Sequence, residues 1–359
     1  MDERWTELAK VLVNYSVKVQ PGDRVLITMM ETDTYPLARA CYQEAIRAGG
    51  MPFIEFQSVY LERDLMKLGN DEQVAWVNEM HLHGMDWADC YIGLRGARNP
   101  SEFSGIDSGR LASHKKAMGV ISARRCDATR WVLTRVPNES FAQQSGKALD
   151  DMMDFYFAST TCDYEATLDF LTKVKALYDR GTQVRIVGKD TDITFSTKGK
   201  TYELGDGKCN IPDGEIFTSP DETTVNGYIY FEFPGVYSGK NIYGIRLAFE
   251  NGVLTEARSD TDNELLQGIL HMDEGACKVG EFGIGLNYNI TDYCYDILYD
   301  EKIGGTIHLA MGRAYTECGG KNYSALHWDI VKDLRQEGSV YVDGVKIMEK
   351  GKYIFPKEQ

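Results

Sequence analysis

The sequence lacks any apolar run close to the length that a membrane span requires. A helix needs about 20 consecutive apolar residues to cross a bilayer, and every apolar run in these 359 residues is far shorter. The first residues, MDERWTELAK, are acidic and amphipathic, without the basic start and apolar centre of a secretory signal. We therefore expect a cytoplasmic protein with no membrane partner.

The cysteine spacing of a zinc ribbon or a disulfide framework is also missing. The eight cysteines are scattered along the chain, and no two of them form a CxxC pair. We expect reduced thiols in a reducing compartment. No single cysteine is indicated as a nucleophile by its neighbours.

Phosphate-binding motifs are absent as well. The chain has no GxGxxG and no GxxxxGK[ST], and the turn after its first apolar strand, METDTYP, contains no glycine that would let the backbone approach a pyrophosphate. The formal net charge is −15 at pH 7, which disfavours a polyanionic partner. The sequence therefore predicts no nucleic-acid partner.

What is present begins with a β-α-β pattern. RVLITMM at 24–30 is an apolar strand, residues 37–50 have helical spacing and end in two glycines, and PFIEFQSV at 52–59 is a second strand. This order predicts a parallel sheet. Further strands are predicted at 88–96, 117–123 and 129–137, and a helix is predicted at 108–116.

The pattern changes near residue 182. The preceding segment, 147–179, is mostly helical, whereas the rest has alternating apolar strands, hairpin turns such as ENG and KGK, and one helix at about 261–277. The predicted fold is an α/β N-terminal domain with a parallel sheet plus a C-terminal α+β, β-rich catalytic domain. We expect these domains to cover residues 1–183 and 184–359.

Histidine is scarce, yet two of the six histidines interrupt apolar strands. In TIHLAMG, His308 lies on the strand face opposite Ile307 and Leu309. In ALHWDIV, His327 and Asp329 are two residues apart and share one face. An imidazole and a carboxylate aimed at one point suit a divalent metal of the zinc, cobalt, manganese or iron type. A hydrogen-bonded structural histidine is the alternative reading.

Two glutamates strengthen the metal interpretation. Glu215 follows a PDG turn in NIPDGEIFTSP, and Glu281 lies between glycines in VGEFGIGLN. Both interrupt apolar, glycine-flanked stretches where a surface charge is not expected. Exposed loop carboxylates are the alternative for each.

These segments together resemble the aminopeptidase T family of metallopeptidases. The resemblance is carried by NIPDGEIFTSP, VGEFGIGLN, DEKIGGTIHLAMGRAY and SALHWDI, and it extends upstream through residues 129–159 and 185–200. It implies a metal-dependent aminopeptidase that acts on short peptides through water activated by two divalent ions (Zn, Co or Mn), and a homodimer. The implied ligands are Glu215, Glu281, His308, Tyr315, His327 and Asp329. Glu301, in the DEK segment, is the implied proton shuttle, and Tyr315 is also implied in catalysis.

This sequence departs from the family in one respect, and it leaves rival functions open. The link between Tyr315 and His327 is compact and the chain is shorter, which affects the substrate range.

Ring-cleaving dioxygenases of the dihydroxypyridine type share the scaffold but bind one Fe(II), and His271 is a conceivable substitute ligand. A non-catalytic protein would be favoured by loss of ligands, and none of the six is missing. Retention of Glu215 and Glu281 favours the hydrolase.

Overall fold

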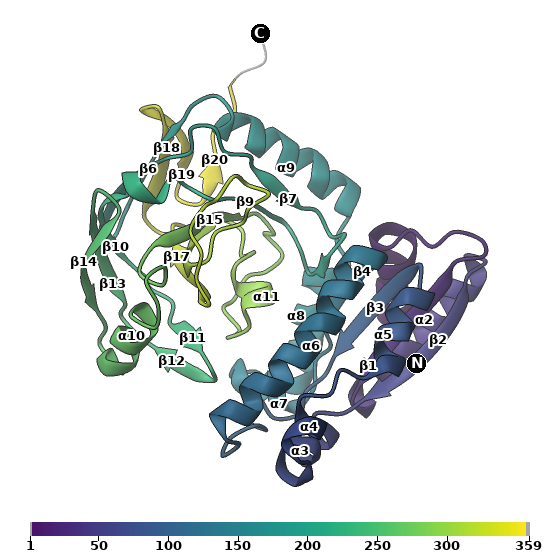
Figure 1. Cartoon of the computed structure of the whole chain (residues 1–359). Coiled ribbons are helices and arrows are strands. Elements are labelled where there is room, and N and C mark those ends of the chain that lie inside the picture. Colours follow the sequence, from purple (N-terminus) through teal and green to yellow (C-terminus); the bar gives the residue numbers. More distant parts are fainter. Residues whose placement is uncertain (1, 357–359) are drawn as a thin grey trace. The chain divides into compact units, whose positions relative to one another are not determined.

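The computed structural model describes residues 2–356, which form two compact units (Figure 1). The first unit runs to Cys162 and includes Gly207–Pro212; the second contains Asp163–Asp206 and the chain from Asp213 onward. The division differs from the predicted boundary at residue 183. It falls earlier because helix α9 (Tyr164–Tyr178) buries Leu171 and Val174 in the core of the second unit.

A parallel sheet forms the centre of the first unit. Its order is β2-β1-β3-β4-β8 and every neighbouring pair is parallel. The strands are β1 (Arg24–Met30), β2 (Met51–Gln57), β3 (Cys90–Arg95), β4 (Arg130–Arg135) and β8 (Asn210–Ile211). The α-helices are α1 (Arg4–Lys10), α2 (Tyr35–Arg47), α3 (Val59–Leu68), α4 (Asp71–Val74), α5 (Glu79–Trp87), α6 (Ser108–Ala128), α7 (Glu139–Gln144) and α8 (Leu149–Thr160).

The segment 117–123, predicted as a strand, lies inside helix α6. His114, Ala117 and Ile121 are its buried residues, and this spacing of three and four is the stripe of a helix rather than the alternation of a strand. The Asp107 side chain accepts a hydrogen bond from the Arg110 amide and caps the helix. The strand prediction was therefore wrong, because the short apolar run belongs to a long, mostly exposed helix.

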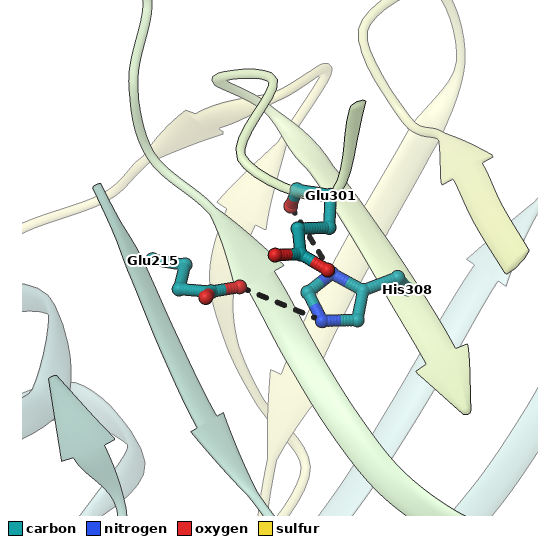
Figure 2. A group of neighbouring side chains, drawn as sticks. All are labelled: Glu215, Glu301 and His308. Atoms are coloured by element: carbon teal, nitrogen blue, oxygen red, sulfur yellow. Dashed lines mark hydrogen bonds and ion pairs between the residues drawn. The ribbon is translucent and has the colours of Figure 1, made fainter. Parts of the chain in front are cut away.

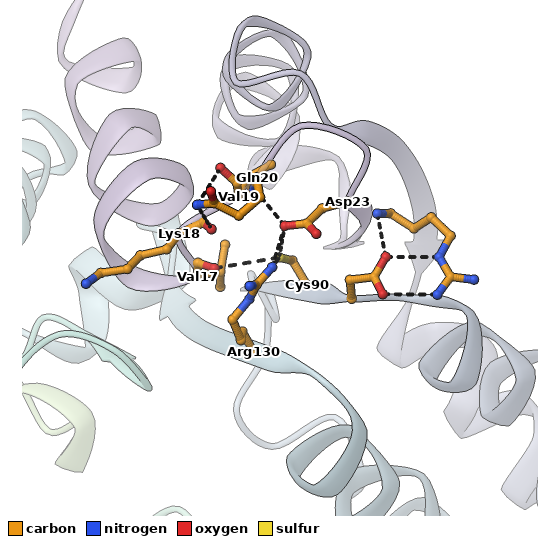
Figure 3. Close-up of polar contacts among 9 residues, drawn as sticks. Val17, Lys18, Val19, Gln20, Asp23, Cys90 and Arg130 are labelled. Carbon is orange, nitrogen blue, oxygen red and sulfur yellow. Dashed lines mark hydrogen bonds and ion pairs between the residues drawn. The ribbon is translucent and has the colours of Figure 1, made fainter.

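Ion pairs join the amino ends of the central strands in this unit. Arg24 contacts Asp89 with Nε–Oδ2 and Nη2–Oδ1 distances of 3.0 Å each, and its amide donates to the same carboxylate. Figure 3 shows Arg130 reaching from β4 to Asp23 past the buried Cys90. These contacts connect the starts of β1, β3 and β4.

The second unit is built from antiparallel sheets. An eight-stranded sheet has the order β14-β13-β10-β6-β5-β18-β19-β20, a five-stranded sheet has the order β17-β16-β15-β9-β7, and β11 pairs with β12. The strands are β5 (Gln183–Gly188), β6 (Thr191–Ser196), β7 (Glu203–Gly205), β9 (Glu215–Thr218), β10 (Asn226–Tyr230), β11 (Gly235–Tyr237), β12 (Lys240–Ile242), β13 (Arg246–Glu250), β14 (Val253–Arg258), β15 (Val279–Gly285), β16 (Thr306–Gly312), β17 (His327–Asp333), β18 (Gly338–Val342), β19 (Val345–Glu349) and β20 (Lys352–Tyr353).

Helices are short in this unit apart from α9. Helix α10 (Asn263–Leu270) falls within the predicted 261–277 segment, and α11 (Ile297–Asp300) precedes Glu301. The parallel sheet followed by a β-rich half confirms the predicted fold class. Within residues 2–356, none of the helices combines the length and the apolar character needed to span a bilayer.

The five-stranded sheet has one apolar face and one polar face. Phe282, Ile284, Ile307 and Leu309 belong to the core of the second unit. Successive side chains of a strand point to opposite faces, so the residues between these apolar positions lie on the other face. That second face holds the histidines and carboxylates identified in the sequence.

Candidate metal centre

Strand register brings the predicted residues onto one face of the five-stranded sheet. Asp329 on β17 lies opposite Ala310 on β16, which lies opposite Glu281 on β15. In the adjacent row, His308 lies opposite Gly283. Residues opposite each other across antiparallel strands share a face. Side chains from residues as far apart in the sequence as Glu281 and Asp329 thereby become neighbours.

One group of potential ligands contains Glu215, Glu301 and His308. One ligand atom from each of the three lies within 4.8 Å of the others. The His308 Nε2 atom is 3.6 Å from Glu215 Oε2. Figure 2 shows the Glu215 and Glu301 carboxylates converging on the His308 ring from different segments. This geometry fits a single cation bound between them.

A second group contains Glu281, His327 and Asp329, again with one ligand atom each within 4.8 Å. The His327 Nε2 atom is 3.1 Å from Glu281 Oε2 and 3.6 Å from Asp329 Oδ2. The other oxygen of Glu281, Oε1, is 3.5 Å from His308 Nε2. One oxygen of Glu281 therefore faces His308 of the first group, and the other faces His327 of the second group.

Both histidines are oriented by backbone carbonyls. His308 Nδ1 is 3.1 Å from the Glu301 carbonyl oxygen, and His327 Nδ1 is 2.8 Å from the Arg313 carbonyl oxygen. A carbonyl only accepts hydrogen bonds, so each Nδ1 is the donor. The Nε2 atom of each ring is then directed at the carboxylates. Burial lowers the pKa of each histidine, but the hydrogen bond to Glu281 outweighs it and raises the pKa of His308 to about 10 and that of His327 to about 9. A bound cation would take the place of the Nε2 proton, with Nδ1 still held by the carbonyl, as is found around metal-bound histidines.

Tyr315 borders the second group. Its ring centroid is 5.0 Å from that of His327 and 5.3 Å from that of Phe217. Burial, followed by the nearby charges of Glu281 and Asp329, raises the pKa of the Tyr315 hydroxyl well above its usual value. The Tyr315 ring thus packs against His327 of the second group; its role as a metal ligand stays a prediction.

Lys302 is fully buried at the first group. Its Nζ atom is 3.3 Å from Glu215 Oε1, and it forms a shorter ion pair with Glu301. Burial opposes the lysine charge, but Glu215 and Glu301 outweigh that effect and raise its pKa. The sequence analysis did not identify this residue, although a lysine directly after Glu301 and before an apolar strand was the available signal.

The buried carboxylates carry opposing pKa shifts. Burial raises the pKa of Glu215 to about 8, against the attraction of Lys302. Burial also raises the pKa of Asp329 to about 6, with a further contribution from the Glu281 charge. For Glu281, burial acts in the same direction, but hydrogen bonds from His308 and His327 outweigh it and lower the pKa to about 2.

The donor set fits a divalent cation. Glu215 Oε2 and Asp329 Oδ1 are buried oxygens without a hydrogen-bond partner among the described residues. Unpaired buried carboxylate oxygens are costly, and a bound cation would satisfy them. Imidazole nitrogens combined with carboxylate oxygens suit zinc, cobalt and manganese.

His271 lies apart from both groups. It caps the C-terminal end of α10, is exposed, and its Nδ1 atom is 2.8 Å from the carbonyl oxygen of Gln267. Its position fits an ordinary helix-end residue rather than a substitute ligand.

Comparison with known proteins identifies the family. A family model described as thermophilic metalloprotease (M29) matches residues 1–355. The chain belongs to the M29 metalloprotease family. This result confirms the resemblance inferred from the motifs, and it establishes that the chain is a metal-dependent enzyme of the peptidase type.

Several M29 relatives cover nearly the whole chain. Aminopeptidase T of Thermus aquaticus is 28% identical, covering 98% of this chain and 98% of the relative. Aminopeptidase AmpS of Bacillus subtilis (strain 168) is 26% identical, covering 93% and 90%. Aminopeptidase 2 of Geobacillus stearothermophilus is 24% identical, covering 87% and 83%.

Two solved structures share the fold. Wild-type AmpT from Thermus thermophilus superimposes with a TM-score of 0.84 at 22% identity, covering 98% of this chain and 99% of that one. The 2,5-dihydroxypyridine dioxygenase from Pseudomonas putida KT2440 superimposes with a TM-score of 0.63 at 15% identity, covering 98% and 97%. The dioxygenase is the more distant of the two, and its similarity concerns the fold alone.

Proposed function

We propose that this protein is a metal-dependent aminopeptidase that releases N-terminal amino acids from short peptides. The observation that carries the proposal is the pair of adjacent histidine–carboxylate groups on one sheet face, joined by Glu281, in a member of the M29 family. Its relatives named above are aminopeptidases. The ring-cleaving dioxygenase alternative is not adopted, because a single iron would leave one group without a role.

We assign two divalent ions, zinc, cobalt or manganese, to the two groups. The ligands in this assignment are Glu215, Glu281, His308, Tyr315, His327 and Asp329. Glu281 would help to hold both ions, since its two oxygens lie 3.5 Å and 3.1 Å from the histidines of the two groups. When bound, such ions polarise a carbonyl and activate water at neutral pH.

Glu301 is the proton shuttle in this mechanism. Its carboxylate lies beside Glu215 and His308 and is held by Lys302. It would take a proton from the attacking water and return it to the departing amine. The ion pair with Lys302 fixes this carboxylate in place beside His308.

The acidic character of the site would also select the end of the peptide that binds. A free α-amine is cationic, and the site presents the buried Glu215 and Glu281 and the partly buried Asp329. Attraction of the amine would place the first peptide bond at the reacting position. A homodimer and a cytoplasmic location also belong to the proposal, and the buried Cys41 thiol is consistent with a reducing compartment.

Metal content and hydrolysis test the proposal together. Purified protein is analysed for metals and assayed on aminoacyl-nitroanilides after addition of cobalt, zinc or manganese, alongside a Glu281→Gln variant. We expect close to two ions per chain, fewer in the variant, and nitroaniline release that falls with metal content. One iron per chain, unaffected by Glu281→Gln and without hydrolysis, would contradict the proposal.

A further inference from the structure

A small pocket adjoins the second ligand group. Its volume is about 160 Å³. It is lined by residues of β11 and the turn after it, of the segment ending in α11, and of β17: Val236, Tyr237, Ser238, Tyr293, Ile297, His327, Trp328 and Asp329. His327 and Asp329 are proposed metal ligands, so a group that fills this pocket lies directly beside the reacting position.

The walls of the pocket are fixed by contacts away from the ligands. Trp328 Nε1 donates to the Val236 carbonyl oxygen at 2.9 Å, and the Trp328 and Tyr237 rings pack edge to face at 6.1 Å. The Tyr293 hydroxyl donates to the Pro234 carbonyl oxygen at 2.7 Å. The pocket is therefore preformed, which lowers the ordering cost of binding.

The chemistry of the lining excludes charged occupants. Apart from the two proposed ligands, its side chains are apolar, aromatic or hydroxyl-bearing, and none carries a charge. A cationic or anionic side chain buried there would lose water without gaining an opposite charge beyond the metal site. An apolar cavity of about 150 Å³ accommodates benzene, so the space matches a phenyl or a branched aliphatic group.

We propose that this pocket binds the side chain of the N-terminal residue of the substrate and selects large uncharged residues such as Phe, Leu and Met. The inference rests on the proposed aminopeptidase function. A substrate held by its α-amine at the carboxylates has its first side chain only two bonds from that amine. A pocket that shares His327 and Asp329 with the metal site is within that reach.

Ile297 offers the sharpest test. It is 41% exposed and is the first residue of α11, so a carboxylate there remains in contact with water. Ile297→Glu places a negative charge at the pocket without disturbing the core. We expect the ratio of kcat/KM for Arg- over Phe-nitroanilide to rise at least about tenfold. Ile297→Trp fills the pocket and should lower the Phe-over-Ala ratio by a similar factor.

A matched control separates the pocket from general effects of charge. Val253→Glu makes the same type of change at a 55% exposed position on β14 and should leave the order of substrates unchanged. If both Ile297 variants are active and neither changes the order of substrate preference, the pocket assignment is overturned while the aminopeptidase proposal remains intact. Failure of the unmodified protein to hydrolyse any aminoacyl substrate would overturn both.

Discussion

Gly283 lies directly beneath the His308 imidazole. The two residues face each other across β15 and β16, and a Cβ atom added at Gly283 would be 1.8 Å from His308 Nε2. No side chain other than hydrogen fits at this position without moving the ring. The glycine in VGEFGIG is therefore required by the histidine on the next strand.

Substitution of Gly283 by alanine should displace the His308 ring. The backbone at Gly283 is outside the left-handed region, so the steric contact with the imidazole is the main effect. We expect metal affinity to fall by at least about tenfold, measured by titration of metal-free protein. Gly268→Ala on α10 is the control, because a Cβ there meets no atom within 4 Å. Equal metal affinity in both variants would contradict the proposed role of His308.

Lys302→Met should reduce turnover more than metal binding. The substitution removes the cation that holds Glu301, so the proton shuttle loses its fixed position and kcat should fall by about a hundredfold. The site becomes more negative, so its content of divalent ions should not decrease. Both quantities are measured on purified folded protein, with KM determined in the same experiment.

Lys332→Met provides the matched control for that experiment. Lys332 is the other fully buried lysine among the described residues of the second unit, and it pairs with Glu232 at 2.6 Å. Breaking a buried ion pair costs about 3–5 kcal/mol, so both variants should be less stable. Only Lys302→Met should lose kcat. A comparable loss in both would assign Lys302 a purely structural role.

The sequence allowed the ligand types to be predicted because strand alternation is local. His308 between apolar residues, and the two-residue spacing of His327 and Asp329, place polar side chains on one face without tertiary information. Strand register is not local, so the position of Gly283 opposite His308 and of Glu281 between the histidines appeared only in the structure. Lys302 was missed because its burial and its contact with Glu215 depend on tertiary structure, although its other partner, Glu301, is its neighbour in the chain.

Length explains the error in the first unit. The apolar run at 117–123 is equally compatible with a strand and with about two turns of a long helix. The structure shows a helix, because Asp107 caps its start and the helical hydrogen bonding continues to Ala128. The prediction of the strands at the site did not suffer from this error. Polar and apolar residues alternate along these strands, and this period of two is not the period of a helix.

Asp89→Asn should lower stability at neutral pH and lose its effect in acid. Hydrogen bonds from the Arg24 side chain and amide lower the pKa of Asp89 to about 2, below the unfolded value of about 3.9. The stabilisation of the folded protein by the Arg24–Asp89 interaction is therefore present above pH ~4 and disappears as pH falls towards 2. Because the pair is partly exposed, we expect only about 1 kcal/mol.

Urea unfolding of the first unit at several pH values measures that difference. Asp64→Asn is the control, since Asp64 is exposed on α3 and forms no ion pair within residues 2–356. A destabilisation by Asp89→Asn that stays constant down to pH ~2 would show that the Arg24 contact does not depend on the charge.

Tyr315→Phe isolates the contribution of a single hydroxyl group at the metal centre. The ring packs between Phe217 and His327, and phenylalanine preserves these contacts, so the fold should be retained. Loss of one polar group aimed at the reacting atoms lowers kcat by about a hundredfold or more in comparable sites. We expect that loss in nitroanilide hydrolysis at saturating metal. Tyr323→Phe, on the same loop and 87% exposed, should keep full activity. If Tyr315 instead acts only as a metal ligand, excess metal would restore the rate of Tyr315→Phe. A defect that persists at high metal concentration would show that the hydroxyl takes part directly in catalysis.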